Sequence, residues 1–318
     1  MLESSVVIRG ESISQIYPIV LRQVLERGAD VAPRGLPTVE VLGCQLLLER
    51  PRARVLHATG RVINPAFAIA EAAWILSGSD EPWIYQYNES LQAYTDDGVL
   101  RGAYGPRLRR WAGQVDQLDH VRRLLLREPE SRQAVVQLFD PSRDWSDCRD
   151  VPCTIGHRFF VRNGALHMHS SMRSQDAWLG LPYDIFANTV LQELLAGWLE
   201  VDVGTYVHSM DSLHLYRDDL SGAADVVMAG SDSAGDIDDV DLSLPFDSMD
   251  TTLAATISGD RSCLSPGWVA YASVLESYRD WKTGYKQEAM AVLGSISDPL
   301  NSALRRWYAH LGARAAHA

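Results

Sequence analysis

Two β-rich runs flank the dipeptide Asn163-Gly164 in the segment CTIGHRFFVRNGALHMHSSMRS. An Asn-Gly pair in this position is the strongest short-range signal for a β-hairpin, because a two-residue turn needs positive φ angles that these residues tolerate. The sequence therefore predicts an antiparallel pair of strands near the middle of the chain.

Three segments carry helix signals. Residues 13–28 place apolar side chains at helical spacing and end at a glycine, which suits a helix C-terminus. Asn64 and Pro65 precede the run AFAIAEAAWILSG, where Asn suits the N-cap, Pro the first helical position and Gly78 the end. Residues 188–200 favour a third helix.

Further strands are expected after the turn at Arg34, in residues 134–141, and from GTYVHS onward. Residues 86–111 are rich in Gly and Tyr and indicate mostly loop. Residues 221–250 are acidic and indicate a solvated loop, because the spacing of an EF-hand calcium site is absent. Without repeats or a clear linker, the pattern predicts one domain of α/β or α+β class.

Composition excludes several functional classes. The net charge of −12 over 318 residues argues against sequence-independent binding of duplex nucleic acid, which needs a cationic face. No apolar run approaches the roughly 20 residues of a membrane span. The N-terminus lacks the pattern of a secretory signal, and four cysteines are too few for a disulfide framework. These observations predict a soluble cytoplasmic protein with free thiols and no membrane partner.

Cys153, in DVPCTIG, is the first candidate for chemistry. A lone cysteine is more often a small buried side chain than a nucleophile. A zinc site is not expected, because no His or Cys pair at ligand spacing completes Cys148 and Cys153. Gly-rich phosphate-binding loops are absent as well. We therefore expect no metal, and a role for Cys153 depends on its sequence context.

That context is a string of motifs in a fixed order. DVPCTIG is followed by MRSQDAWLGLPYDIFAN and then by VHSMDSLHLY. The string resembles the thymidylate synthase family, whose signature is a P-C-H nucleophile, then Q-R-S-x-D-x-x-L-G-x-P-F-N, then D-x-H-x-Y. The match covers residues 34–217, about three-fifths of the chain. The resemblance implies a mixed β-sheet with flanking helices and a homodimer formed sheet to sheet. It also implies one catalytic domain over residues 1–318, with a divergent segment at about 285–318.

The resemblance assigns roles along the nucleotide. Cys153 corresponds to the nucleophile that adds to C6 of a pyrimidine ring. Arg173 and Ser174 correspond to ligands of the nucleotide phosphate, and Arg173 also favours the thiolate. His214 and Tyr216 correspond to the groups that bind the sugar hydroxyl.

Two further arginines match the family's phosphate ligands. Arg34 matches a mobile N-terminal arginine after a one-residue gap. Arg132 matches an arginine that the family donates across the dimer, but its usual second arginine is Gln133 here. The resemblance also implies 5,10-methylenetetrahydrofolate as co-substrate.

Four residues match the family's proton-handling and folate-orienting positions. They are Glu71, Tyr104, Asp176 and Gly180. Taken one at a time, a helix-face Glu or a core Tyr is ordinary. The joint order of the motifs carries the assignment.

Asp184 departs from the family pattern. Thymidylate synthases carry an asparagine here, which donates to O4 and accepts from N3–H of uracil. Cytosine presents an amino donor at N4 and an unprotonated N3, so an acidic side chain fits it better. The change resembles the cytidylate hydroxymethylase branch of the family, for either CMP or dCMP. A helix-capping aspartate is the alternative.

Other departures concern the lid. Ser90 and Gln92 stand where the family has bulky aromatics, and the C-terminus LRRWYAHLGARAAHA lacks the family's closing tail. Such lids exclude water while a reactive intermediate is reduced. Their loss favours capture of the intermediate by water, giving hydroxymethyl instead of methyl. Thr154 and Met172 also differ from the family, with effects that the sequence does not reveal.

The sequence therefore predicts a folate-dependent cytidylate 5-hydroxymethyltransferase with Cys153, Glu71, Tyr104 and Asp184 as catalytic residues. A C5-methyltransferase acting on cytidylate or uridylate is the first alternative. A catalytically silent nucleotide- or RNA-binding protein is the second. The choice between ribose and deoxyribose stays open.

Overall fold

The computed structural model describes residues 6–145, 149–230 and 240–317. Cys148 and the middle of the acidic segment lie outside the described residues. Within these ranges, no helix has both the length and the apolar character needed to cross a membrane.

Eight strands form one mixed sheet in the described ranges. They are β1 (Val6–Gly10), β2 (Ala29–Val31), β3 (Thr38–Leu48), β4 (Val135–Gln137), β5 (Thr154–Arg162), β6 (Ala165–Met172), β7 (Gln175–Asp176) and β8 (Asp202–Tyr216). Along the main path the order is β1-β3-β8-β6-β5-β4, and β2 and β7 pair with β3 and β8. β1 runs parallel to β3, and β6 and β7 run parallel to β8, while the other pairs are antiparallel.

The predicted hairpin is confirmed. β5 and β6 are joined at Asn163 and Gly164, whose φ angles are 51° and 74°. Positive φ at both positions is what the tight turn requires, and the Asn-Gly pair supplies it at low cost. The strand β8 lies next to this hairpin and also pairs with β3, so it joins the two halves of the sheet.

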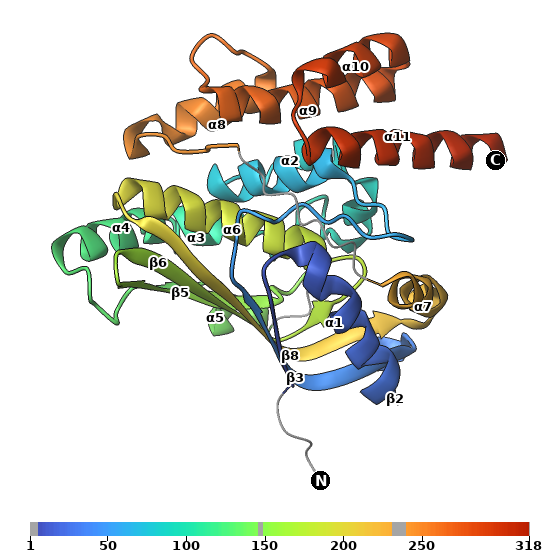
Figure 1. Ribbon diagram of the computed structural model, residues 1–318. Coiled ribbons are helices and arrows are strands. Elements are labelled where there is room, and N and C mark those ends of the chain that lie inside the picture. The colour runs from blue at the N-terminus through green and yellow to red at the C-terminus, as the bar shows by residue number, and fades with distance from the viewer. Residues whose placement is uncertain (1–5, 146–148, 231–239, 318) are drawn as a thin grey trace.

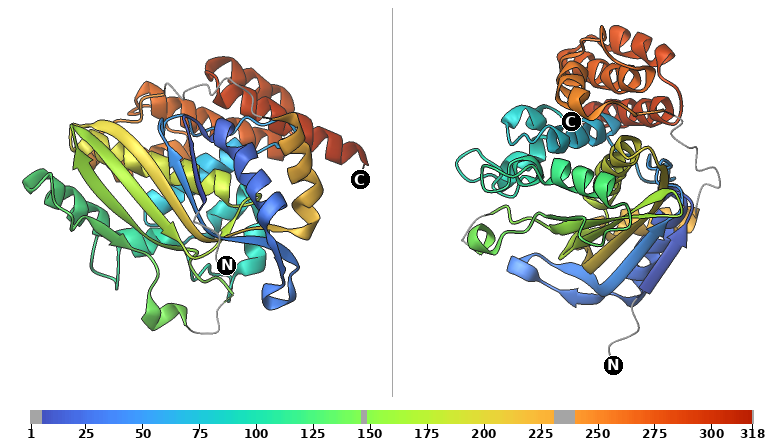
Figure 2. Two further views of the ribbon diagram at one scale, coloured as in Figure 1. Left: turned by 60° about the horizontal axis from the view of Figure 1, so that its bottom comes forward. Right: turned by 90° about the vertical axis from the view of Figure 1, so that its left-hand side faces the viewer.

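Helices cover one face of this sheet in two layers (Figure 1). The α-helices of the described residues are α1 (Ile13–Arg27), α2 (Pro65–Leu76), α3 (Tyr104–Arg109), α4 (Gln117–Arg127), α5 (Pro141–Asp144), α6 (Leu181–Trp198), α7 (Leu220–Ala229), α8 (Met249–Ser258), α9 (Pro266–Thr283), α10 (Lys286–Val292) and α11 (Leu300–His317), of which the short α5 lies apart from the two layers. The second view in Figure 2 shows α2 and α6 between the sheet and the outer layer of α8 to α11. The predicted mixed sheet with flanking helices is confirmed.

The helix α2 begins as its sequence predicts. The Asn64 side chain accepts hydrogen bonds from the backbone N–H groups of Ala66 and Phe67, and Pro65 fills the first helical position. Apolar residues surround most of the helix, because it is buried between the sheet layer and the outer helices. Its Phe67 ring packs edge-on against Tyr183 of α6, with ring centroids 4.8 Å apart.

Four sequence expectations need correction. The helix expected at 188–200 begins earlier, at Leu181, because Pro182 in its first turn is compatible with a helix N-terminus. The strand expected at 134–141 spans only Val135–Gln137, since Pro141 starts α5. Residues 86–111 contain more than loop, because short 3₁₀ segments and α3 lie there. The first part of 221–250 is not a loop but α7, which buries Ala223 and Val226.

The divergent C-terminal segment folds onto the rest of the chain. Tyr308 of α11 stacks on Trp281 of α9, with ring centroids 4.1 Å apart. The Arg306 guanidinium donates to the backbone carbonyls of Ala58 and Arg61. The core is continuous from Ile8 near the N-terminus to Tyr308.

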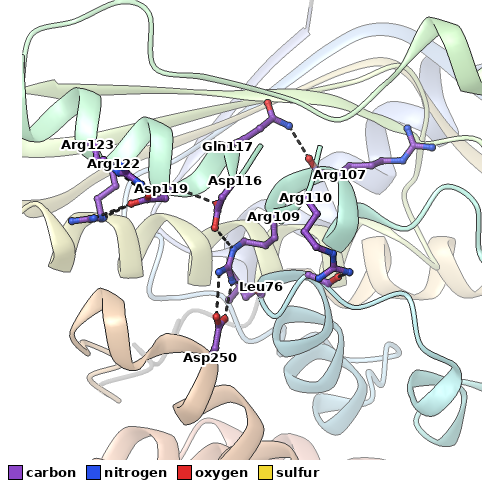
Figure 3. Close-up of polar contacts among 11 residues, drawn as sticks. Leu76, Arg107, Arg109, Arg110, Asp116, Gln117, Asp119, Arg122, Arg123 and Asp250 are labelled. Atoms are coloured by element: carbon purple, nitrogen blue, oxygen red, sulfur yellow. Dashed lines mark hydrogen bonds and ion pairs between the residues drawn. The ribbon is translucent and has the colours of Figure 1, made fainter. Parts of the chain in front are cut away.

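A polar clamp joins the two helical layers (Figure 3). Arg109 of α3 donates to the Asp116 carboxylate at 2.9 Å, to the Leu76 carbonyl at 2.7 Å and to the Asp250 carboxylate at 2.9 Å. The Arg109 side chain is 11% exposed, so its partners Leu76 and Asp116 would lose a largely desolvated donor if it were removed. The clamp fixes α8 over α2 and α3.

Arg109→Met is expected to lower the free energy of unfolding by about 2–3 kcal/mol, because it leaves partly buried acceptors without a donor. Urea denaturation measures this change. Asp250→Asn is the control and should cost less than about 1 kcal/mol, since Asp250 is largely exposed. An equal loss of unfolding free energy in the two variants would contradict the role assigned to Arg109.

Candidate active site

A cleft of about 1310 Å³ lies at the end of the sheet where β5 begins and β6 ends. Ten of the residues predicted from the sequence line it: Arg34, Glu71, Cys153, Arg173, Ser174, Asp176, Gly180, Asp184, His214 and Tyr216. A pocket for one small molecule usually spans about 300–1,000 Å³, so this cleft has room for two ligands.

Hairpin pairing brings Cys153 and Arg173 together. The Arg173 backbone N–H donates to the Cys153 carbonyl at 2.9 Å, and its guanidinium donates to the carbonyls of Val151 and Pro152, each at 2.9 Å. One guanidinium nitrogen lies 3.8 Å from the Cys153 Sγ. The segment before β5 therefore holds a cation against the sulfur.

Burial nevertheless raises the pKa of the Cys153 thiol above its ordinary value. The Arg173 guanidinium lowers this pKa and the Asp184 and Asp150 carboxylates raise it, while Arg34 lowers it. Desolvation outweighs the cations, so the ligand-free site favours the thiol. The Arg173 guanidinium thus opposes the effect of burial on the Cys153 pKa without outweighing it.

Tyr104 lies behind the nucleophile and not among the residues that line the cleft. Its hydroxyl accepts a hydrogen bond from the Thr154 backbone N–H at 3.2 Å. Burial, together with Cys153 and Asp184, raises the pKa of its phenol. Tyr104 thus contacts the backbone next to Cys153 and stays neutral.

The phosphate residues divide into two groups. Arg34 lies in a turn and lines the cleft. Its φ of 52° is a left-handed backbone conformation, which bends the chain sharply at this residue. Arg132 is exposed and lines a separate depression with Glu130 and Arg162. The structure therefore does not bring Arg132 into the cleft of its own chain.

Sheet pairing positions the residues predicted for the sugar. β7 pairs with β8 so that Asp176 lies beside His214. The His214 and Tyr216 rings are perpendicular, with centroids 5.4 Å apart. An Asp176 carboxylate oxygen accepts from the backbone N–H groups of Trp178 and Leu179, at 2.7 and 2.8 Å, which fixes the loop leading to α6.

Two carboxyl groups share the floor of the cleft. Burial, with a contribution from the Asp184 carboxylate, raises the pKa of Glu71 to about 8. Burial also raises the pKa of Asp184 to about 6, opposed by a hydrogen bond from Gln175 and assisted by Asp176. At neutral pH Glu71 is mostly protonated and Asp184 mostly ionised, which gives the site a proton donor and an acceptor.

One wall of the cleft is not predicted from the sequence. Four residues of α11 line the cleft, and they are Trp307, His310, Leu311 and Arg314. Their spacing of three or four residues is the helical-face signal that could have identified them. The C-terminal segment therefore contributes to the site although it lacks the family's tail sequence.

Trp307 and Trp178 give this wall its chemistry. The Trp307 Nε1 is buried and has no hydrogen-bond acceptor among the described residues. The Arg61 guanidinium lies over the Trp178 ring, 4.6 Å from its centroid. Among the described residues, no cluster of three His, Cys, Asp or Glu side chains is placed to hold a metal ion.

Comparison with known proteins adds two findings. A family model described as thymidylate synthase matches residues 15–233. A deoxyuridylate hydroxymethyltransferase of Bacillus phage SP01 is 35% identical over 224 residues. That alignment covers 66% of this chain and 58% of the phage protein, so the chain spans little more than half of the relative's length.

The raised pKa of Glu71 predicts a pH-dependent stability. The folded protein holds a proton that the unfolded chain releases above its ordinary pKa near 4.5, so stability falls as the pH rises from there to about 8. Glu71→Gln should therefore raise the melting temperature relative to the wild type by about 3 °C more at pH 8.5 than at pH 5.

Scanning calorimetry at the two pH values measures this difference. The exposed Glu288→Gln serves as the control for loss of a carboxylate. A difference in melting temperature between the wild type and Glu71→Gln that is the same at both pH values would refute the raised pKa of Glu71.

Proposed function

Because the chain belongs to the thymidylate synthase family, we propose that it transfers a one-carbon unit to C5 of a cytidylate and delivers it as a hydroxymethyl group. The unit comes from 5,10-methylenetetrahydrofolate. The observation that carries the proposal is the carboxyl of Asp184 in the cleft, held by a donor from Gln175.

Cys153 starts the reaction. Its thiolate forms a bond to C6 of the pyrimidine, and the electron pair of the C5–C6 double bond becomes available at C5. A bound phosphate near Arg173 and Arg34 immobilises the nucleotide for this attack. The methylene carbon bridges two folate nitrogens, and its bond to the first breaks as C5 forms a bond to it. Loss of the proton from C5 then breaks its bond to the second nitrogen, which leaves an exocyclic methylene on the pyrimidine and releases tetrahydrofolate. Water adds to the exocyclic methylene, and the Cys153 sulfur leaves C6.

Asp184 selects the base. Its carboxylate accepts a hydrogen bond from the N4 amino group of cytosine, as acidic side chains do when they recognise cytosine in DNA. Uracil presents the O4 oxygen at the same place, and two acceptors facing each other in a buried site repel. An ionised Asp184 therefore favours cytosine.

Glu71 supports the proton transfers. Its carboxyl lines the same cleft as Asp184, and burial together with the Asp184 charge raises its pKa to about 8. A group with such a pKa both donates and accepts a proton readily. Glu71 is thus the group that protonates the departing folate nitrogen or orients the water.

The second half of the cleft suits the folate. The Trp307 Nε1–H has no acceptor in the part of the chain that the structure describes, and the Trp178 and Trp307 rings offer apolar faces for a flat heterocycle. Arg314 lies at the same wall and can pair with the carboxylates of a glutamyl tail. Asp176 and Gly180 complete this side of the site.

Water capture explains why the product would be hydroxymethyl. The indole-rich run of the family is replaced in the sequence by a stretch with Ser90 and Gln92. The phage relative carries hydroxymethyltransferase in its name, which supports the same outcome. Reductive methylation would instead oxidise the folate to dihydrofolate.

A uridylate 5-hydroxymethyltransferase is the second candidate. The name of the phage relative, a deoxyuridylate hydroxymethyltransferase, favours it. It requires Asp184 to carry a proton when the nucleotide binds, so that the acid donates to O4. The pKa of about 6 places that form in the minority at neutral pH.

A homodimer is also part of the proposal. The helices of the described residues leave one face of the sheet uncovered (Figure 2). Val7 and Leu42 are 62% and 60% exposed on their strands. Exposed apolar side chains on an open sheet favour pairing with a second copy. Such a pairing would let Arg132, which is remote from its own cleft, serve the partner's site.

Mass spectrometry of the product tests the activity. The enzyme is incubated with methylenetetrahydrofolate and each of CMP, dCMP, UMP and dUMP. A hydroxymethyl group on a cytosine nucleotide, without dihydrofolate, is expected, and Cys153→Ser should give none. A methyl group with dihydrofolate would contradict the proposal. Normal nucleotide binding without any turnover in the wild type would favour a silent binding protein.

Asp184→Asn should reverse the base preference. An amide can donate to O4 and accept from N3–H, so the variant should lose about a hundredfold in kcat/KM for cytidylate and gain activity on uridylate. Steady-state kinetics with both nucleotides measures the change. Retention of the wild-type preference would show that Asp184 does not recognise the base.

Complementation tests the role of Arg132. Arg132→Ala and Cys153→Ser should each be nearly inactive alone. A one-to-one mixture after refolding together should regain about a quarter of the wild-type rate, because half of the dimers hold one complete site. No recovery, or an active monomer by light scattering, would refute the shared site.

A further inference from the structure

A chain of hydrogen bonds links Asn188 to Asp184 through three buried side chains, and we name it the Asn188 circuit. The Asn188 amide donates to the Tyr206 hydroxyl at 2.9 Å, and this hydroxyl lies 2.7 Å from the His208 Nδ1. The His208 Nε2 lies 2.7 Å from the Gln175 Oε1, and the Gln175 Nε2 donates to the Asp184 Oδ2 at 2.8 Å. The circuit begins and ends on α6, one helical turn apart.

The circuit is dry. Gln175, Tyr206 and His208 are 2%, 1% and 0% exposed. Burial lowers the pKa of His208 to about 3 and raises the pKa of Tyr206, so both side chains stay neutral. Each member must therefore satisfy its hydrogen bonds with protein groups, either in the circuit or, for the Tyr206 hydroxyl, also with Ser170, because an unmatched buried group is costly.

Neutrality gives the circuit a direction. The Tyr206 oxygen accepts from the Asn188 amide. The Gln175 Oε1 beside the His208 Nε2 can only accept, so the neutral ring has its free lone pair on Nδ1, which accepts the Tyr206 proton. His208 then carries its proton on Nε2 and donates to the Gln175 Oε1, which turns the Gln175 amide N–H toward Asp184. Asp184 Oδ2 is thereby an acceptor, and no hydrogen bond from a described residue reaches Oδ1.

Gly180 leaves room for the last contact. A Cβ on this residue would lie 3.0 Å from the Gln175 Nε2 and 3.2 Å from the Asp184 Oδ2. Both distances are tighter than ordinary contacts of a side-chain carbon, so a larger residue would press on the hydrogen bond. The loop thus accommodates the Gln175–Asp184 pair in addition to lining the cleft.

We propose that the Asn188 circuit is a specificity-determining device, which keeps Asp184 an acceptor and thereby selects pyrimidines with an exocyclic amino group. The inference rests on the proposed function, because it concerns the same base. Gln175, His208 and Tyr206 are positioning residues, since they act through Asp184. The reversed direction would require a proton on Asp184 Oδ2.

Other ionisable groups surround Asp184. They are Asp176 of β7, Glu71 of α2, Tyr104 of α3, Cys153 ahead of β5 and Tyr206 of β8. All five are neutral or anionic, so none of them stabilises a negative Asp184. The Gln175 N–H is the group that favours the ionised form, and its loss should make Asp184 harder to ionise.

Gln175→Met tests the proposal with Gln192→Met as the matched control. Gln192 is an equally buried glutamine of α6, but its amide donates only to the backbone carbonyls of Leu166, Gly204 and Thr205. Both variants lose buried hydrogen bonds, and only the first alters Asp184. The measurements are kcat and KM for cytidylate and uridylate across the pH range.

In Gln175→Met the cytidylate-to-uridylate ratio of kcat/KM should fall about tenfold or more, mainly through KM. The acid limb of the cytidylate profile should also move to higher pH. Gln192→Met should show neither change. The proposal would be overturned if Gln175→Met kept the wild-type cytidylate-to-uridylate ratio of kcat/KM and the wild-type acid limb of the pH profile. Equal changes in Gln175→Met and Gln192→Met would overturn it as well.

A second variant guards against misfolding. Gln175→Glu keeps the shape and the acceptor for His208 but places a carboxyl against Asp184, so the acid limb should again move to higher pH. An unchanged limb would overturn the circuit. Wild-type preference for uridylate would instead refute the proposed substrate, which separates the two failures.

Discussion

The long strand β8 is the constraint on which the site depends. It pairs antiparallel with β3 and parallel with both β6 and β7. The same pairing that builds the sheet sets Asp176 beside His214 and Tyr216 opposite Thr38. Backbone hydrogen bonds therefore gather residues that lie far apart in sequence, and the helices of the middle layer close the cleft over them.

Desolvation gives these residues their chemistry. Burial raises the pKa of Cys153, Glu71 and Asp184 alike, so the ligand-free site carries less charge than its composition suggests. A nucleotide phosphate bound beside Arg173 would pair with its guanidinium. The ionisation of the other site residues would then depend on the bound base and on hydrogen bonds such as the one from Gln175. The protein thus controls ionisation mainly through water exclusion and a few oriented donors.

Much of this arrangement could be predicted from local signals. The Asn163-Gly164 turn fixes the hairpin, and its register alone brings Cys153 close to Arg173. Ten predicted site residues line one cleft. Cys153, Arg173 and Tyr216 lie at or next to the ends of strands that the sheet aligns. Glu71 and Asp184 instead reach the cleft from α2 and α6. The Gln175–His208 contact could not be predicted, because it depends on the register of β7 against β8. The α11 wall was missed because nothing local shows what a C-terminal helix packs against.

Release of tritium from C5 tests the central claim most directly, because substitution at C5 requires loss of its hydrogen after Cys153 has added to C6. The enzyme is offered methylenetetrahydrofolate with equal amounts of cytidylate and uridylate, each labelled at C5 in a separate reaction. Label is expected to enter water from cytidylate and to stay on uridylate. Release from uridylate alone, or from neither nucleotide, would contradict the central claim.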